Sequence, residues 1–352
     1  MRIRSHMGFR PMNDNHIEAS RFISRSLGTH EPFELHALSS VLSGSKRSFR
    51  RILYGKGRSA ILMHYASIPE ENTYFAPISM YLQEMGIPVP RILAHDPDKG
   101  FLLMEDLGDL DLWTFRNAPW ETRQKYYHDT LDIVFRLHAF PTQDFPSEKV
   151  PLTAGFGPEL YRWERSYFLE NFVGAVCGIQ LSPSDGQCLN QELKALADRL
   201  DSIKPCLVHR DLQSRNIMIF KGKPYLIDFQ GMRFGNLFYD LGSLLYDPYV
   251  CLADDERMEL LDHYYHLMAK EGSMRLGWPD FEELFREASA QRLMQALGAY
   301  GFLGLVQELP DFLAHVPNGL ANLIDATGHA KRLPLLNDLA RQCNSVVSQA
   351  GN

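Results

Sequence analysis

Residues 207–231 read LVHRDLQSRNIMIFKGKPYLIDFQG, and the fold can be argued outward from this stretch. Two apolar runs, residues 216–220 and 224–228, flank a Lys-Gly-Lys tripeptide at 221–223. Short apolar runs separated by a glycine-containing turn are typical of a β-hairpin. We therefore predict a hairpin here, preceded by a polar loop.

Three polar side chains surround this hairpin: Asp211 in the loop before it, Asn216 at its start and Asp228 at its end. A hairpin brings that loop beside the end of its second strand, so we expect the three to lie close together. Phosphoryl transfer needs a carboxylate that orients and deprotonates the attacking hydroxyl, and oxygen ligands for Mg²⁺. Asp211 suits the first role, and Asn216 and Asp228 suit the second. Each residue alone is typical of a turn or cap, but the combination favours catalysis.

The pattern H-R-D-x-x-x-x-N followed by I-D-F resembles the protein-kinase-like superfamily, and its details resemble the aminoglycoside phosphotransferase branch. A later Tyr239-Asp240-Leu241 is a further feature of that branch. The resemblance implies that Asp240 braces the catalytic loop without reacting, and an ordinary carboxylate at a helix start is the open alternative. We expect His209 to hold the loop through hydrogen bonds rather than to transfer protons.

Within that branch, four segments resemble the bacterial anomeric N-acetylmuramate/N-acetylglucosamine kinases. They are SFRR at 48–51, GIPVPRIL at 86–93, FLLMEDLG at 101–108, and the block that runs from DFQ at 228 to YDLGSLL at 239–245. The resemblance covers roughly residues 35–265. It implies ATP (or GTP) and Mg²⁺ as cofactors and an amino sugar, phosphorylated at its anomeric hydroxyl, as the acceptor.

The residue patterns around the motif change character along the chain. Before residue 108 they predict a helix at 16–27, a hairpin of strands 49–53 and 59–65, a helix within 70–85, and strands at 91–95 and 101–105. Later, apolar spacing predicts helices at 120–140, 158–175 and 189–203. We expect an α+β, bilobal protein-kinase-like fold with a small β-rich N-lobe and a larger helical C-lobe. The predicted domains are a tail and helix at 1–34, a nucleotide-binding N-lobe at 35–108 and the C-lobe at 109–352.

The nucleotide side of the site is predicted from the resemblance. Kinase-like hinges bind adenine through backbone groups, so we assign the backbone from Glu105 to Leu107 to adenine. The loop at 42–48, with Ser45 among its small hydroxyl residues, is assigned to the phosphates. A single glycine in that loop is equally typical of an ordinary turn.

A lysine that kinase-like enzymes usually place on the next strand is missing, because residues 59–65 read SAILMHY. Arg50 and Arg51 lie on the preceding strand and must face opposite sides of it. Either one could contact phosphate in place of the lysine, and the resembled amino-sugar kinases also tend to carry SFRR. A degraded, inactive pseudokinase is the alternative explanation.

The acceptor is expected near Asp211. Residues 161–168 read YRWERSYF, and the aromatic and acidic side chains of such a helix suit a sugar. Glu164 is a possible substrate contact, by resemblance to a glutamate of related sugar kinases. A surface helix glutamate is the alternative.

Composition excludes other classes of function. With 36 Lys+Arg against 43 Asp+Glu, the formal net charge is −7, which disfavours a nucleic-acid binder. Five scattered cysteines predict free thiols, and no apolar run is long enough to cross a membrane. We expect a cytoplasmic, small-molecule kinase whose partners are a nucleotide and an acceptor. An aminoglycoside or amino-alcohol kinase and a nucleotide-binding scaffold are the alternatives.

Overall fold

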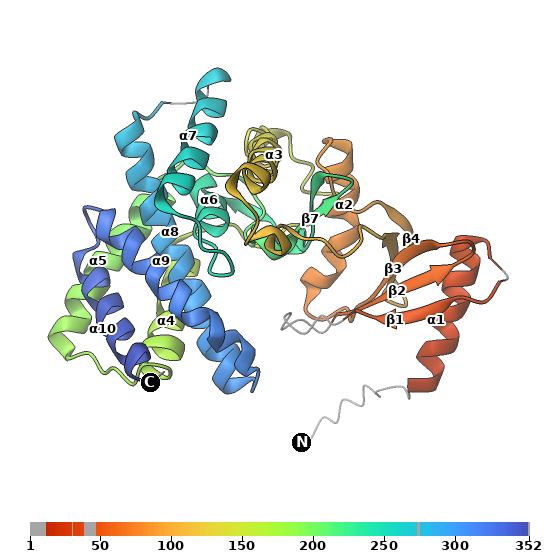
Figure 1. Ribbon diagram of the computed structural model, residues 1–352, viewed down its shortest axis with the longest axis horizontal. Coiled ribbons are helices and arrows are strands. Elements are labelled where there is room, and N and C mark those ends of the chain that lie inside the picture. The colour runs from red at the N-terminus through yellow and green to blue at the C-terminus, as the bar shows by residue number, and fades with distance from the viewer. Residues whose placement is uncertain (1–11, 30, 39–46, 273–274, 351–352) are drawn as a thin grey trace. The chain divides into compact units, whose positions relative to one another are not determined.

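The computed structural model describes residues 12–29, 31–38, 47–272 and 275–350 (Figure 1). By its internal contacts the chain divides into a first unit, Met1–Met80 with Pro90–Asp106, and a second unit, Tyr81–Val89 with Leu107–Asn352. The first unit holds the larger sheet, and most helices belong to the second. The α+β class predicted from the sequence is confirmed.

The sheet of the first unit has five antiparallel strands in the order β1-β2-β3-β5-β4. Its strands are β1 Glu34–Ala37, β2 Ser48–Tyr54, β3 Arg58–His64, β4 Ile92–Asp96 and β5 Phe101–Glu105. The predicted hairpin is confirmed as β2 and β3, and Gly55 and Gly57 in its turn take positive φ values of 53° and 73°. Strand β1 was not predicted, because ELHA is short and its side chains are mostly exposed.

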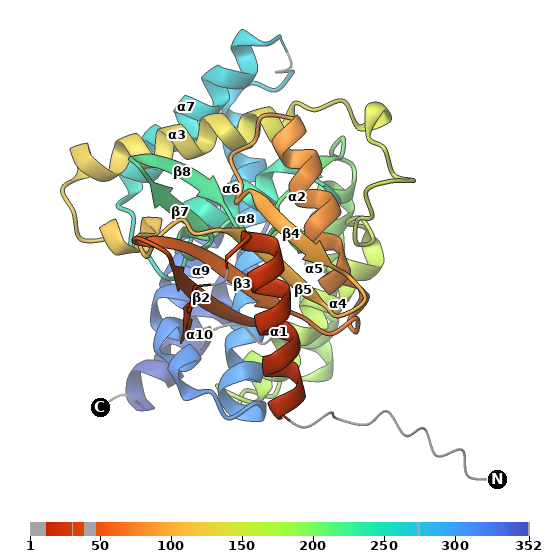
Figure 2. The same cartoon turned by 90° about the vertical axis from the view of Figure 1, so that its right-hand side faces the viewer.

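The helix α1 (Met12–Leu27) packs on one face of this sheet (Figure 2). Phe22 and Ile23 of α1 share a buried cluster with Ile52 of β2 and Leu62 of β3. Because side chains alternate along a strand, Arg50 lies on the same face of the sheet as Ile52, which is the face that α1 covers. Arg51 lies on the opposite face.

The predicted helix within 70–85 consists of a 3₁₀ turn, η1 (Glu70–Tyr74), followed by α2 (Phe75–Glu84). Pro77 lies in the first turn of α2, where a missing N–H breaks no helical hydrogen bond. Gly86 follows the helix with φ of 72°, and Ile87 N–H donates back to the Leu82 carbonyl. The predicted end of this helix by residue 85 is confirmed.

The second unit consists mainly of helices, with two small strand pairs. Its helices are α3 Trp120–His138, α4 Pro158–Phe168, α5 Pro183–Asp201, α6 Leu237–Leu245, α7 Asp254–Lys270, α8 Trp278–Gly301, α9 Val316–His329 and α10 Pro334–Ala350. The predicted helix at 158–175 changes after Phe168 to a π-helical segment, Leu169–Gly174. No helix in the described ranges is long and apolar enough to span a membrane.

The predicted hairpin in the second unit is confirmed as β7 (Ile217–Phe220) and β8 (Lys223–Leu226). A second pair, β6 (Cys206–Val208) with β9 (Arg233–Gly235), was not predicted. The polar loop of the motif connects β6 to β7. Helix α8 packs against α4, α6 and α9, and it is buried along most of its length.

Candidate active site

The loop after β6 is fixed by a buried carboxylate from α6. Asp240 is 0% exposed, and its two oxygens accept the backbone N–H groups of His209, at 2.6 Å, and Arg210, at 2.7 Å. Arg210 has a φ of 78°, a conformation that costs energy for a residue with a side chain. Asp240 stabilises that strained turn. The cap of α6 is Asn236, whose side chain accepts from Tyr239 N–H, and Asp240 lies in the first turn of that helix.

Further buried groups support this loop, and of these only His209 was predicted from the sequence. His138 of α3 lies between Asp240 and Tyr264, with Nε2 3.1 Å from an Asp240 oxygen and Nδ1 2.7 Å from the Tyr264 hydroxyl. His209 Nε2 lies 3.0 Å from the Ile227 carbonyl, which ties the loop to the end of β8. Asp247 accepts both the N–H and the hydroxyl of Ser214 at 2.8 and 2.6 Å. These contacts fix the loop at several points.

Asp211 is partly open to solvent, with its side chain 30% exposed, and it lies among positive charges. Arg210 Nη1 is 3.4 Å from one of its oxygens, and Arg292 Nη2 is 3.6 Å from the other. Burial acts to raise the pKa of Asp211, but Arg210 and Arg292, with smaller contributions from His209 and Arg233, outweigh burial and hold that pKa below its ordinary value. The carboxylate is therefore ionised at neutral pH.

Asn216 and Asp228 meet the chemical requirements of a magnesium site. The Asn216 side-chain NH₂ donates to the Asp211 carbonyl at 2.9 Å, so its amide orientation is fixed and the oxygen is the atom left to bind a cation. Asp228 takes a left-handed conformation, with φ of 61°, and accepts a hydrogen bond from the Gln230 amide at 2.7 Å. Among the described residues, no three His, Cys, Asp or Glu side chains form a complete metal site. Two oxygen ligands suit Mg²⁺, which usually keeps waters and substrate phosphates in its other positions.

Glu164 of α4 is 0% exposed, so the alternative of a surface glutamate is wrong. The Tyr239 hydroxyl donates to one of its oxygens at 2.8 Å and the Gln291 amide to the other at 2.7 Å. Burial raises the pKa of Glu164, and these hydrogen bonds offset part of that effect. Glu164 can therefore affect a bound acceptor only through Tyr239 and Gln291, the two residues that donate hydrogen bonds to it.

In the first unit, Arg51 is on the sheet face opposite α1. Its guanidinium forms a two-point ion pair with Asp106, with contacts of 2.7 and 3.1 Å. The predicted opposition of Arg50 and Arg51 is confirmed by the strand register. Glu105 N–H donates to the Arg91 carbonyl at 2.8 Å, so that N–H is already used within the sheet.

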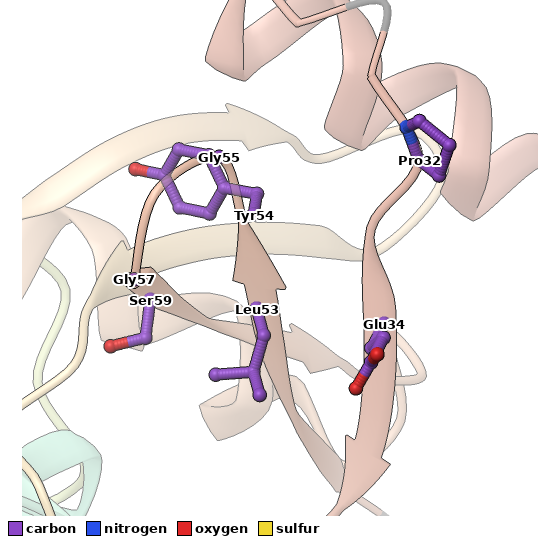
Figure 3. Close-up of a pocket in the computed structure, with 7 residues that line it drawn as sticks. All are labelled: Pro32, Glu34, Leu53, Tyr54, Gly55, Gly57 and Ser59. Atoms are coloured by element: carbon purple, nitrogen blue, oxygen red, sulfur yellow. The ribbon is translucent and has the colours of Figure 1, made fainter.

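The remaining nucleotide predictions have less structural context. Leu107 has a buried side chain, so only its backbone could meet a ligand. Ser45 lies outside the described residues. A groove of the first unit is lined by residues near the β2–β3 turn, and none of the predicted site residues is among them (Figure 3). These lining residues are Pro32, Glu34, Leu53, Tyr54, Gly55, Gly57 and Ser59.

Known proteins share sequence similarity with this chain. The sequence model of the family described as "Phosphotransferase enzyme family" matches residues 40–284. An N-acetylmuramate/N-acetylglucosamine kinase of Pseudomonas putida is 27% identical over 311 residues, covering 87% of this chain and 88% of that protein. An N-acetylmuramate/N-acetylglucosamine kinase of Pseudomonas aeruginosa is 27% identical over 332 residues, covering 90% of this chain and 91% of that protein.

Solved structures share the fold. The ethanolamine kinase of Plasmodium vivax has a TM-score of 0.62 at 14% identity, covering 95% of this chain and 92% of that chain. A choline kinase of Streptococcus pneumoniae has a TM-score of 0.56 at 13% identity, covering 88% and 99%. The predicted protein-kinase-like fold is confirmed. Arg292 lies beyond the residues that the family model matches.

Proposed function

The chain belongs to the phosphotransferase enzyme family and is a small-molecule kinase, and we propose that it transfers a phosphoryl group from ATP to the anomeric hydroxyl of an amino sugar. The observation that carries this proposal is the state of Asp211, an ionised carboxylate on a loop that Asp240 holds rigid. A rigid, ionised carboxylate can orient the acceptor hydroxyl and take its proton. A degraded pseudokinase has no need to preserve this arrangement.

Asn216 and Asp228 hold the magnesium ion in this proposal. Mg²⁺, when bound, neutralises charge on the nucleotide phosphates. Gln230 orients Asp228 through its amide, and the Asn216 amide is oriented by the Asp211 carbonyl. The positions of both ligands therefore depend on the same loop as the base.

For the nucleotide, we assign Arg51 rather than Arg50 to the phosphates, because Arg51 lies on the face that α1 leaves uncovered. The Glu105 carbonyl and the Leu107 backbone remain assigned to adenine, since the Glu105 N–H is already bonded. The role of Ser45 stays a prediction. The donor assigned is ATP, with GTP as the alternative.

The charges around Asp211 oppose the alternative acceptors. Aminoglycosides and amino alcohols are cations, and Arg210 and Arg292 both lie within 4 Å of the base. The buried carboxylates near them are engaged within the protein: Glu164 by Tyr239 and Gln291, and Asp240 by the backbone of His209 and Arg210. Like charges repel strongly at short range, so a neutral or acidic sugar fits this site better than a cation.

A panel assay tests the proposal. The purified chain is incubated with ATP and Mg²⁺ and with N-acetylmuramate, N-acetylglucosamine, choline and an aminoglycoside in separate reactions. We expect turnover with the amino sugars and a product that has lost its reducing end, because a phosphate at the anomeric carbon blocks ring opening. Phosphorylation that leaves the reducing end intact contradicts the anomeric assignment. Turnover with choline or the aminoglycoside alone contradicts the acceptor class.

A further inference from the structure

Arg233 is a buried arginine that forms no ion pair within 4.0 Å among the described residues. It lies on β9 opposite Val208 of β6, is 7% exposed, and donates from Nε to the Gly231 carbonyl at 3.2 Å. No carboxylate of the described part of the chain lies within 4.0 Å of its guanidinium. An unpaired buried charge is costly, so this arrangement calls for an anion.

The surroundings of Arg233 add to that requirement. Burial, and after it the positive charge of Arg210, lowers the pKa of Arg233, and the Asp211 and Glu164 carboxylates, which lie beyond ion-pair distance, offset only part of this effect. Its guanidinium also lies 5.6 Å from the ring centre of Phe156. Arg210 and Arg292 are already paired with Asp211, which leaves Arg233 as the arginine of this group that can accept a new partner.

The position of Arg233 indicates which kind of anion it binds. The Gly231 carbonyl that Arg233 binds belongs to a residue beside the base, because a Cβ built on Gly231 would lie 3.8 Å from an Asp211 oxygen. The acceptor hydroxyl has to reach Asp211. An aromatic ring and a free guanidinium next to that point suit a sugar that carries an acidic substituent.

We propose that Arg233 binds a carboxylate on the acceptor and so determines a preference for acidic over neutral amino sugars. The inference rests on the proposed function. N-acetylmuramate carries a lactyl carboxylate on C3, two ring carbons from the anomeric carbon, whereas its methyl ester and N-acetylglucosamine lack that charge. The interaction is a charge-assisted hydrogen bond, worth about 10- to 100-fold in affinity.

The test compares kcat/KM for N-acetylmuramate and for its methyl ester in the wild type and in Arg233→Gln. We expect the acid-to-ester ratio to exceed ten in the wild type and to fall by about 10- to 100-fold in the variant, mainly through KM. Arg233→Lys keeps the charge and is expected to retain part of the preference. Arg162→Gln, at a side chain 67% exposed, is the matched control and leaves the ratio unchanged.

An unchanged ratio in Arg233→Gln overturns the inference, as does an equal rise in the KM for ATP with both acceptors, which assigns Arg233 to the nucleotide. If Arg233→Gln does not fold, the wild type alone tests the inference. Equal kcat/KM values of the wild type for N-acetylmuramate and its methyl ester overturn the inference. Failure of the proposed function looks different, since no sugar is then phosphorylated at all. In that case calorimetric binding of N-acetylmuramate and its ester to the wild type still tests Arg233, and equal affinities overturn the inference.

Discussion

Arg292 Nη2 lies 3.6 Å from Oδ1 of Asp211, which connects helix α8 directly to the proposed catalytic base. The arginine is itself fixed, because its Nη1 donates to Gln295 at 2.6 Å and its Nε to Ser243 at 3.3 Å. Helix α8 therefore does more than complete the core. Through Arg292 it orients a carboxylate on a loop some 80 residues earlier in the chain.

Replacing Arg292 with methionine is expected to lower kcat by about 100-fold, because Asp211 loses one of the two groups that position it. Arg292→Lys should recover part of the loss, since it keeps the charge without the planar geometry. Steady-state kinetics measure both, with Arg162→Met as the control on an exposed arginine. Equal activity of the methionine and lysine variants contradicts positioning through charge.

Asp240→Asn is expected to lower both activity and stability. One oxygen of the carboxylate becomes an NH₂ that faces a backbone donor, so the His209 or Arg210 N–H loses its acceptor. We expect the free energy of unfolding to fall by about 2–4 kcal/mol. Urea unfolding measures the change, and Asp262→Asn, at a carboxylate 55% exposed, is the control. A loss no larger than that of the control excludes the bracing role.

Arg51→Met is expected to raise the KM for ATP by about tenfold or more, because a phosphate contact is lost. It should also destabilise the first unit, since the ion pair between Arg51 and Asp106 is lost. The double variant Arg51→Met/Asp106→Asn separates the two effects: we expect recovered thermal stability and an unchanged, high KM. If the double variant recovers both the thermal stability and the wild-type KM for ATP, Arg51 does not contact phosphate and acts only in the ion pair with Asp106.

Glu164 predicts a pH dependence of stability. Its pKa in the folded protein lies above the ordinary value of 4.5, so between these two pKa values the folded state keeps a proton that the unfolded state has lost. Stability therefore falls as pH rises through that interval. We expect the difference in unfolding free energy between wild type and Glu164→Gln to shift against the wild type as pH increases above 4.5. A difference that is constant across a urea titration series from pH 4 to 8 contradicts the prediction.

Much of the fold was predictable because its signals are local. Turns at Gly55 and Gly222 separate short apolar runs, so both hairpins were predicted within a few residues. The start of α2 lies close to Pro77, which is compatible with the first turn of a helix. The pairing of β6 with β9 was missed because each strand has three residues and the partners lie 25 or more residues apart. A strand of three residues is too short to show a periodic pattern, and partners so far apart in the sequence are not joined by a recognisable turn.

The site shows the same division. Asp211, Asn216 and Asp228 could be selected from the sequence because their spacing follows from one hairpin. Arg292 and Asp247 could not, because tertiary packing alone brings them to the loop. Gln230 stood within the motif, but its bond to Asp228 depends on the left-handed turn between them. Arg233 also lay a few residues past the motif, without a pattern to mark it.

The central claim is that Asp211 is the base of an amino-sugar kinase, and the most direct measurement is single-turnover phosphorylation of N-acetylmuramate by Asp211→Asn. The account predicts a rate about 10²- to 10⁴-fold below the wild type, with the affinity for ATP preserved and Asp262→Asn unaffected. A rate within threefold of the wild type would contradict it.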